Sequence, residues 1–175
     1  MGDSMKGYVQ VYTGEGKCKT TAALGLVVRA VGAGLRIYLG QFVKGGDYSE
    51  IRLLRARFPE VTLEQYGDGD FVRGKPSPAA IASARRGLAA LNSALLSGLY
   101  DIIIADEASV AVKAGLITEE DLFALIDRKP DTVELVLTGR DASPALQARA
   151  DLVTEMRCIK HYYNAGVQGR KGIES

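Results

Sequence analysis

The sequence predicts an α/β fold, in which a mainly parallel sheet carries helices on both faces. Four runs of continuous apolar residues suit strands that are buried on both sides. Segments with helical spacing alternate with these runs, which is typical of parallel sheets with right-handed crossovers. The 175 residues contain no internal repeat and no linker. We therefore predict one domain over residues 7–175, after a short disordered N-terminus at residues 1–6.

The predicted strands follow the apolar runs, which cover residues 8–12, 37–43, 102–105 and 135–137. Residues 67–78 are the longest stretch without any periodicity. This stretch predicts a surface loop, and long loops in compact domains tend to be functional or mobile.

Four helices are predicted between and after these strands. Leu24, Val27, Val28 and Val31 place one apolar face on the first helix, and residues 81–95 repeat this spacing. The other two are indicated by their N-terminal signals. These are a capping box of Thr118 with Asp121, and the pair Ser143-Pro144.

Composition argues against several classes of partner. Twenty-two basic and twenty-one acidic residues leave a net charge of +1, which favours neither nucleic acid nor a membrane surface. No run of eighteen apolar residues or apolar N-terminal leader occurs, so we expect a cytoplasmic protein. Cys18 and Cys158 form no C-x-x-C pair, and the single histidine, His161, cannot easily build a zinc site.

The stretch T-G-E-G-K-C-K-T-T, at residues 13–21, lies between the first predicted strand and helix. Aligned on Lys19-Thr20, the phosphate-loop pattern G-x-x-x-x-G-K-[ST] places Thr13 and Cys18 where glycines are usual. Gly14 and Gly16 still let backbone N–H groups turn inward around an anion. The start of the helix adds its positive end, with the Lys19 charge for phosphates and the Thr20 hydroxyl for magnesium. The alternative is a glycine-rich turn that binds nothing.

Cys18 raises a separate question about the loop backbone. A cysteine fits this position without strain only if its φ is negative and its Cβ points away from the phosphates. We expect ATP to bind in either case, because backbone donors do not depend on the side chain.

Further candidates end predicted strands. Asp106 and Glu107 follow a buried strand at the carboxyl edge, where α/β sheets bind ligands, and could reach a magnesium ion. Capping of the next helix is the alternative. Arg140 ends another strand and either clamps phosphate or lies on the surface. Arg29 either reaches ligand or pairs with an acid, Phe71 is a loop anchor or a ligand contact, and His161 is interpreted as structural.

These pieces together resemble the ATP:corrinoid (cob(I)alamin) adenosyltransferase family, a group with a P-loop NTPase-like (RecA-like) fold. The family's loop reads G-x-G-K-G-K-T-T, against Gly14-Glu-Gly-Lys-Cys-Lys-Thr-Thr21 here. Further similar segments follow in the same order: Arg29-Ala-Val-Gly32, Gln41-Phe-Val-Lys-Gly45, Asp106-Glu107, Leu137-Thr-Gly-Arg140, Lys160-His161 and residues 165–174.

The resemblance implies transfer of the 5′-deoxyadenosyl group of ATP to the cobalt(I) of a reduced corrinoid, with release of triphosphate. It makes Lys19, Thr20 and Thr21 the grip on the triphosphate. The nucleotide-binding residues it implies in the loop are Gly14, Glu15, Gly16, Lys17, Cys18, Lys19, Thr20 and Thr21. It places Thr20 and Glu107 on Mg²⁺, and Arg29 and Arg140 on phosphate, with Lys19 and Arg140 as the catalytic residues. It also implies a corrinoid contact at Phe71, a flavoprotein reductant and a homodimer.

The chain departs from the family pattern at Cys18, in the segment after Glu107, and around Phe71, where one aromatic residue stands instead of two. It also has too few residues before its first strand for an N-terminal lid helix. Two other functions remain open: a P-loop ATPase that drives a partner, and a non-enzymatic ATP- or corrinoid-binding module. An ATPase needs a residue that orients water, and only Glu107 is a candidate. The products distinguish the three: triphosphate, diphosphate with phosphate, or none.

Overall fold

The computed structural model describes residues 5–67 and 75–174. Phe71, most of the predicted loop at 67–78 and most of the predicted N-terminal segment at 1–6 lie outside the described residues. Within the described ranges, no helix is both long enough and apolar enough to cross a bilayer.

The core of the fold is one six-stranded sheet in the order β3-β2-β4-β5-β1-β6, and every neighbouring pair is parallel. This confirms the predicted α/β class. The strands are β1 (Val9–Thr13), β2 (Ile37–Gln41), β3 (Val61–Gln65), β4 (Ile102–Asp106), β5 (Glu134–Thr138) and β6 (Leu152–Glu155).

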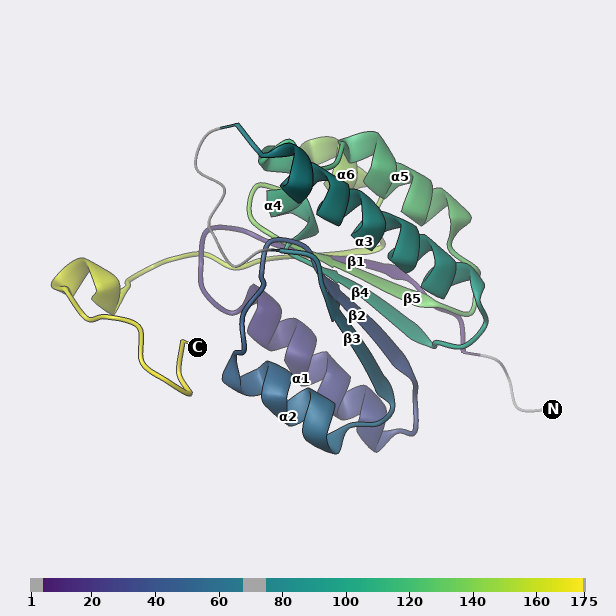
Figure 1. Ribbon diagram of the computed structural model, residues 1–175, viewed down its shortest axis with the longest axis horizontal. Coiled ribbons are helices and arrows are strands. Elements are labelled where there is room, and N and C mark those ends of the chain that lie inside the picture. The colour runs from purple at the N-terminus through teal and green to yellow at the C-terminus, as the bar shows by residue number, and fades with distance from the viewer. Residues whose placement is uncertain (1–4, 68–74, 175) are drawn as a thin grey trace.

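Helices cover both faces of the sheet (Figure 1). One face carries α1 (Lys19–Gly32) and α2 (Ser49–Arg57), and the other carries α3 (Pro78–Leu96), α4 (Ala108–Lys113), α5 (Glu119–Arg128) and α6 (Pro144–Ala148). Each face has its own hydrophobic cluster, because alternate residues of the buried strands point to opposite sides. The predicted capping box of Thr118 and Asp121 is present, and Ser143 caps α6.

Four of the strands and α-helices were not predicted: the edge strands β3 and β6, the charged helix α2 and the short helix α4. The predicted face of α1 is partly wrong, because Val28 is 55% exposed. Ala23, Val27 and Ala30 form the buried stripe instead.

After β6 the chain leaves the sheet as a tail, residues 156–174, which contains a single 3-10 turn, η1 (Tyr162–Ala165). Figure 1 shows the tail extending beyond the strand ends and curling back toward the start of α1. The tail thereby lies beside the loop between β1 and α1, at the edge where the site is found.

Candidate active site

Buried polar residues gather at the carboxyl edge of the sheet. Thr13, Gln41, Asp106 and Thr138 are each the last residue of a strand, and each is at most 5% exposed. The parallel register aligns Gln41 with Asp106 and so brings these ends together. Because buried polar groups are costly unless they bond to one another, this cluster marks the site rather than the general core.

Asp106 is the centre of this cluster and is fully buried. Its Oδ1 accepts hydrogen bonds from the hydroxyls of Thr138 (2.7 Å) and Thr20 (2.9 Å). Its Oδ2 accepts from the Gln41 amide at 2.9 Å and from Lys44 Nζ at 3.3 Å. Four donors from four segments therefore fix the carboxylate, which in turn orients the Thr20 hydroxyl.

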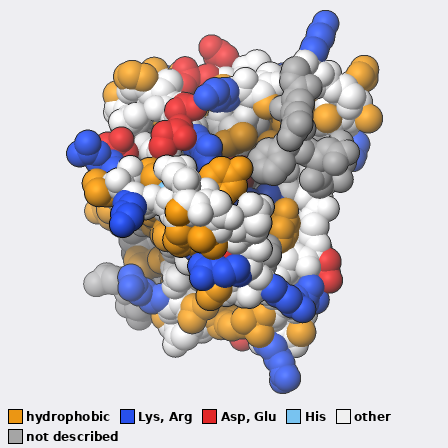
Figure 2. Space-filling view, turned by 90° about the vertical axis from the view of Figure 1, so that its left-hand side faces the viewer, with side chains coloured by type: hydrophobic (Ala, Val, Ile, Leu, Met, Phe, Trp, Pro, Cys, Tyr) orange, Lys and Arg blue, Asp and Glu red, His pale blue; other side chains and the backbone are white. Residues whose placement is uncertain are grey.

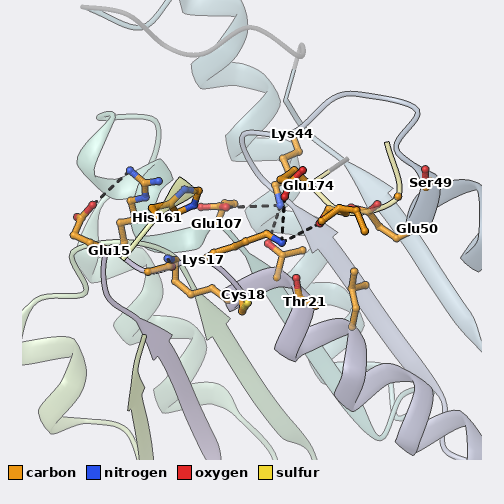
Figure 3. A pocket seen from close by; sticks show the side chains of 17 residues that line it. Glu15, Lys17, Cys18, Thr21, Lys44, Ser49, Glu50, Glu107, His161 and Glu174 are labelled. Atoms are coloured by element: carbon orange, nitrogen blue, oxygen red, sulfur yellow. Dashed lines mark hydrogen bonds and ion pairs between the residues drawn. The ribbon is translucent and has the colours of Figure 1, made fainter. Parts of the chain in front are cut away.

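Lys44 follows β2 and reaches across the strand ends. Its Nζ donates to Thr20 Oγ1 at 2.7 Å and lies 3.7 Å from Glu107 Oε1. The single ammonium therefore touches the hydroxyl and both carboxylates of the cluster, as Figure 3 shows for Glu107.

Glu107 points its carboxylate into the cavity from a strained backbone position, with φ of 59°. Its N–H donates to Thr138 Oγ1 at 2.9 Å, which holds this conformation. Burial, and then the neighbouring Asp106, raise the pKa of Glu107. The residue precedes α4, but its side chain makes no capping hydrogen bond, so the alternative role as a helix cap is not supported.

The loop backbone differs from expectation at two positions. Cys18 has φ of 92°, in the left-handed region, so the negative φ that would make this cysteine free of strain is not found. Gly16 donates its N–H outward, to the carbonyl of Met156 at 2.6 Å, and this donor is not available to an anion. A Cβ on Gly16 would lie 2.6 Å from that carbonyl oxygen, which explains the glycine.

Lys19, the first residue of α1, is buried beneath the loop. Its Nζ donates to the carbonyls of Gly14 (2.6 Å) and Gly16 (2.7 Å). Burial lowers the pKa of Lys19, with a smaller contribution from Arg140, while Glu107 opposes the shift. The ammonium is held by two neutral acceptors and remains near the negative charge of Glu107.

These groups line one cavity of about 560 Å³, within the range of small-molecule sites. Its walls are loop residues 15–21, Lys44, Glu107 and Arg140, and the tail residues His161 and 172–174, with Ser49 and Glu50 at one side. His161, interpreted from the sequence as structural, thus faces the cavity. Figure 2 views this side of the molecule, where Lys and Arg side chains surround hydrophobic ones.

Most of the predicted site residues line this cavity. They include Cys18, Thr20, Thr21 and Arg140. Arg140 ion-pairs with Glu15 at 3.5 Å, and both side chains are exposed.

Lys17 and Arg29 are placed differently from the other candidates. Lys17 lines the cavity but donates to the carbonyl of Ile173 at 2.9 Å, and it lies 3.9 Å from Glu174. Arg29 lies in the last turn of α1, ten residues beyond Lys19, which is about 15 Å along the helix axis. The structure does not bring Arg29 to the cavity.

Sequence reasoning assigned no role to Gln41, Lys44, Thr138 or Glu174. The rule that directed attention to Asp106, a polar residue at the carboxyl end of a buried strand, applies equally to Gln41 and Thr138. Lys44 and Glu174 carry no such local signal, because they reach the site from a loop and from the tail.

Comparison with known proteins agrees with this geometry. A family profile described as "ATP:corrinoid adenosyltransferase BtuR/CobO/CobP" matches residues 5–175. The chain is 32% identical over 170 residues to a corrinoid adenosyltransferase of Pseudomonas aeruginosa, covering 97% of this chain and 84% of the relative. The corresponding enzymes of Salmonella typhimurium (31% over 172 residues) and Escherichia coli (30% over 170 residues) are each matched over 86% of their length and 97% of this chain.

Proposed function

Since this chain belongs to the ATP:corrinoid adenosyltransferase family, we propose that its cavity positions ATP and a divalent cation while the adenosyl group passes to the cobalt of a reduced corrinoid. The observation that carries the assignment of the site is the meeting of Lys19, Thr20, Glu107 and Arg140 around one cavity. These are the cations, hydroxyl and carboxylate that a bound nucleotide triphosphate and its metal require.

The chemistry asks the protein for positioning and charge rather than for a nucleophile. The cobalt(I) electron pair forms the bond to C5′ of ATP, the C5′–O bond breaks, and triphosphate leaves with the electron pair of that broken C5′–O bond. Because cobalt(I) is itself the nucleophile, the reaction requires no serine or cysteine activated by a neighbouring base. We assign the rate acceleration to the orientation of ATP and to the cations that stabilise the departing triphosphate.

Lys19 and Arg140 are the proposed phosphate-binding cations. Lys19 now donates to the carbonyls of Gly14 and Gly16, and a triphosphate in the loop would offer its ammonium a charged acceptor instead. Arg140 is exposed at the cavity mouth with Glu15 as partner, so it can turn to the ligand at little cost. Arg29 is left out of this proposal because of its distance along α1.

The donor set also fits Mg²⁺. Among residues 5–67 and 75–174, no cluster of three or more His, Cys, Asp or Glu could hold a metal ion alone. Mg²⁺ typically takes one or two protein oxygens and completes its shell with phosphate and water. We propose that Thr20 and Glu107 supply those oxygens, with Asp106 orienting the Thr20 hydroxyl. When bound, the ion would neutralise charge that develops on the triphosphate.

The wider setting follows from the same family membership. We propose a cytoplasmic homodimer that receives the reduced corrinoid with the help of a flavoprotein reductant. Size measurement in solution and reconstitution with a reduced flavoprotein test these two points separately.

The decisive experiment combines product analysis with two variants. The protein is incubated with ATP, Mg²⁺ and chemically reduced cobalamin, while the corrinoid spectrum is followed and the phosphate product is identified. We expect adenosylcobalamin and triphosphate, and a loss of about 10²–10³ in turnover for Lys19→Ala and for Glu107→Ala. Lys113→Ala, which removes an exposed lysine paired with Asp141 outside the cavity, is the matched control. Diphosphate with phosphate as the products, or near-normal rates in both site variants, would contradict the proposal.

A further inference from the structure

Lys44 lies where the proposed divalent cation would bind, and this position suggests a role for it before the metal enters. The inference rests on the proposed binding of a divalent cation. We infer that Lys44 is a positioning residue whose ammonium occupies the metal position while the cavity is empty. It moves to the triphosphate when the metal and ATP bind.

The contacts of the ammonium are those of a cation in this position. Lys44 Nζ lies 2.7 Å from Thr20 Oγ1 and 3.7 Å from Glu107 Oε1, the two oxygens assigned to the metal. It also lies 3.3 Å from Asp106 Oδ2, the carboxylate that orients Thr20. In Figure 3 the Lys44 side chain descends from the loop after β2 and meets Glu107 inside the cavity.

An ammonium and a metal ion cannot share these oxygens. The Thr20 hydroxyl donates its proton to Asp106 and accepts from Lys44, so the ammonium already lies against the oxygen that the metal would bind. Mg²⁺ binds oxygen at about 2.0–2.1 Å, which would place it against an ammonium that holds the same oxygen, and the two positive charges would repel. Metal entry therefore requires Lys44 to leave.

In the described part of the chain, no other cation forms an ion pair with Asp106 or Glu107. Ion pairs with Asp106 and Glu107 come from Lys44 in both cases. Lys19 is turned toward the carbonyls of Gly14 and Gly16. Arg140 is paired with Glu15. Without Lys44, the adjacent carboxylates of Asp106 and Glu107 would lose the ammonium that lies within ion-pair distance of both, and only the more distant Lys19 and Arg140 would offset the charge of Glu107.

Lys44 is also suited to departure. It lies in the irregular segment between β2 and α2, and it carries its charge on a flexible four-carbon stem. Its side chain lines the same cavity as the loop, so a triphosphate that enters provides a new partner close by. Lys44 would then exchange its carboxylate partners for the triphosphate, so its charge would stay paired.

The test compares the affinity for Mn²⁺, a spectroscopic substitute for Mg²⁺ at oxygen sites, with and without ATP. Electron paramagnetic resonance measures free Mn²⁺ with wild-type protein, Lys44→Met and Lys44→Gln. Lys113→Met is the control, because Lys113 also pairs with a carboxylate but lies outside the cavity. Circular dichroism and the thermal midpoint of each variant show that it is folded.

The Lys44 variants should change the affinity for Mn²⁺ in opposite directions without and with ATP. Without nucleotide, both Lys44 variants should bind Mn²⁺ about tenfold tighter than wild type, because no charge-assisted hydrogen bonds have to be broken first. With ATP present, the same variants should bind the Mn²⁺–ATP complex several-fold more weakly, because a phosphate partner is missing. The control should match wild type in both.

Three results would overturn the inference. Unchanged Mn²⁺ affinity without nucleotide, together with weaker Mn²⁺–ATP binding, would make Lys44 a phosphate ligand only. Weaker binding in both conditions would make it a structural residue. If wild-type protein binds no Mn²⁺ even with ATP, the metal assignment to Thr20 and Glu107 fails as well, whereas either of the first two results leaves that assignment intact.

Discussion

Replacing Cys18 with glycine tests whether the nucleotide loop stores backbone strain. Cys18 has φ of 92° and ψ of 2°, a left-handed conformation that is unfavourable for any residue with a Cβ. The side chain is exposed, so its removal sacrifices little packing. The substitution changes the backbone energy almost alone, which makes its effect on stability calculable.

Two terms of opposite sign decide the result. Relief of the left-handed conformation contributes about 1–2 kcal/mol to the folded state. The greater freedom of glycine in the unfolded chain costs about 0.4–1 kcal/mol. The difference predicts that Cys18→Gly raises the free energy of unfolding by about 0.5–1 kcal/mol, and the melting temperature by about 2–3 °C for a domain of this size.

Urea denaturation, followed by circular dichroism, measures the change, and two variants isolate its cause. Cys18→Ala removes the thiol but keeps the Cβ, so it should bring no such gain. Cys158→Gly makes the same chemical change at a residue outside the positive-φ set, and should lower stability by about 0.4–1 kcal/mol. ATP affinity should be kept or improved in Cys18→Gly. A lower denaturation midpoint, or an equal gain in Cys18→Ala, would refute the strain argument.

Three further predictions concern single side chains. Thiol reagents should modify Cys18 before Cys158, and ATP with Mg²⁺ should protect Cys18 because it lines the cavity; mass spectrometry of the labelled peptides checks both points. The raised pKa of Glu107 keeps its proton bound to higher pH than the ordinary value of 4.5, so Mn²⁺–ATP binding should weaken on acidification before pH 4.5 is reached, and flat affinity down to that pH would contradict the assignment. Because the pKa of Glu107 is higher in the folded protein than in the unfolded chain, this residue stabilises the fold at pH values below its ordinary pKa. The contribution is lost as the pH rises through the raised pKa of the folded protein. Ser109 Oγ is buried without a hydrogen-bond partner among the described residues, so Ser109→Ala should leave stability unchanged or raise it by about 1 kcal/mol in urea titration.

The predicted and the missed strands differ in burial. β2, β4 and β5 are covered on both faces, and their continuous apolar runs reveal them without any knowledge of neighbours. β3 and β6 are the two edges of the sheet, and β6 is exposed at all four residues. An edge strand buries too little to require an apolar run, so its existence depends on the partner strand rather than on its own side chains.

The functional site, like the sheet, could be predicted only in part. Lys19, Thr20 and Glu107 were predictable because each adjoins a strand or helix end that the sequence reveals. The left-handed backbone of Cys18 was not predictable, because it depends on how the loop is held between β1, α1 and the tail. Lys44 could not be assigned either, since its role arises from a contact with Thr20, 24 positions earlier in the chain.

Two hydrogen bonds join the nucleotide loop to the tail, from the Gly16 N–H to the Met156 carbonyl and from Lys17 to the Ile173 carbonyl, and they affect the order of folding. The second of these spans 156 positions, almost the whole chain. Both contacts come from residues that follow β6 in the chain, so we expect the tail to reach the loop only after β6 has paired with β1. The parallel core can assemble while the nucleotide loop still lacks the wall that the tail provides. We therefore expect ATP binding during refolding to lag behind the recovery of secondary structure, and nucleotide capture to mark the last stage of maturation.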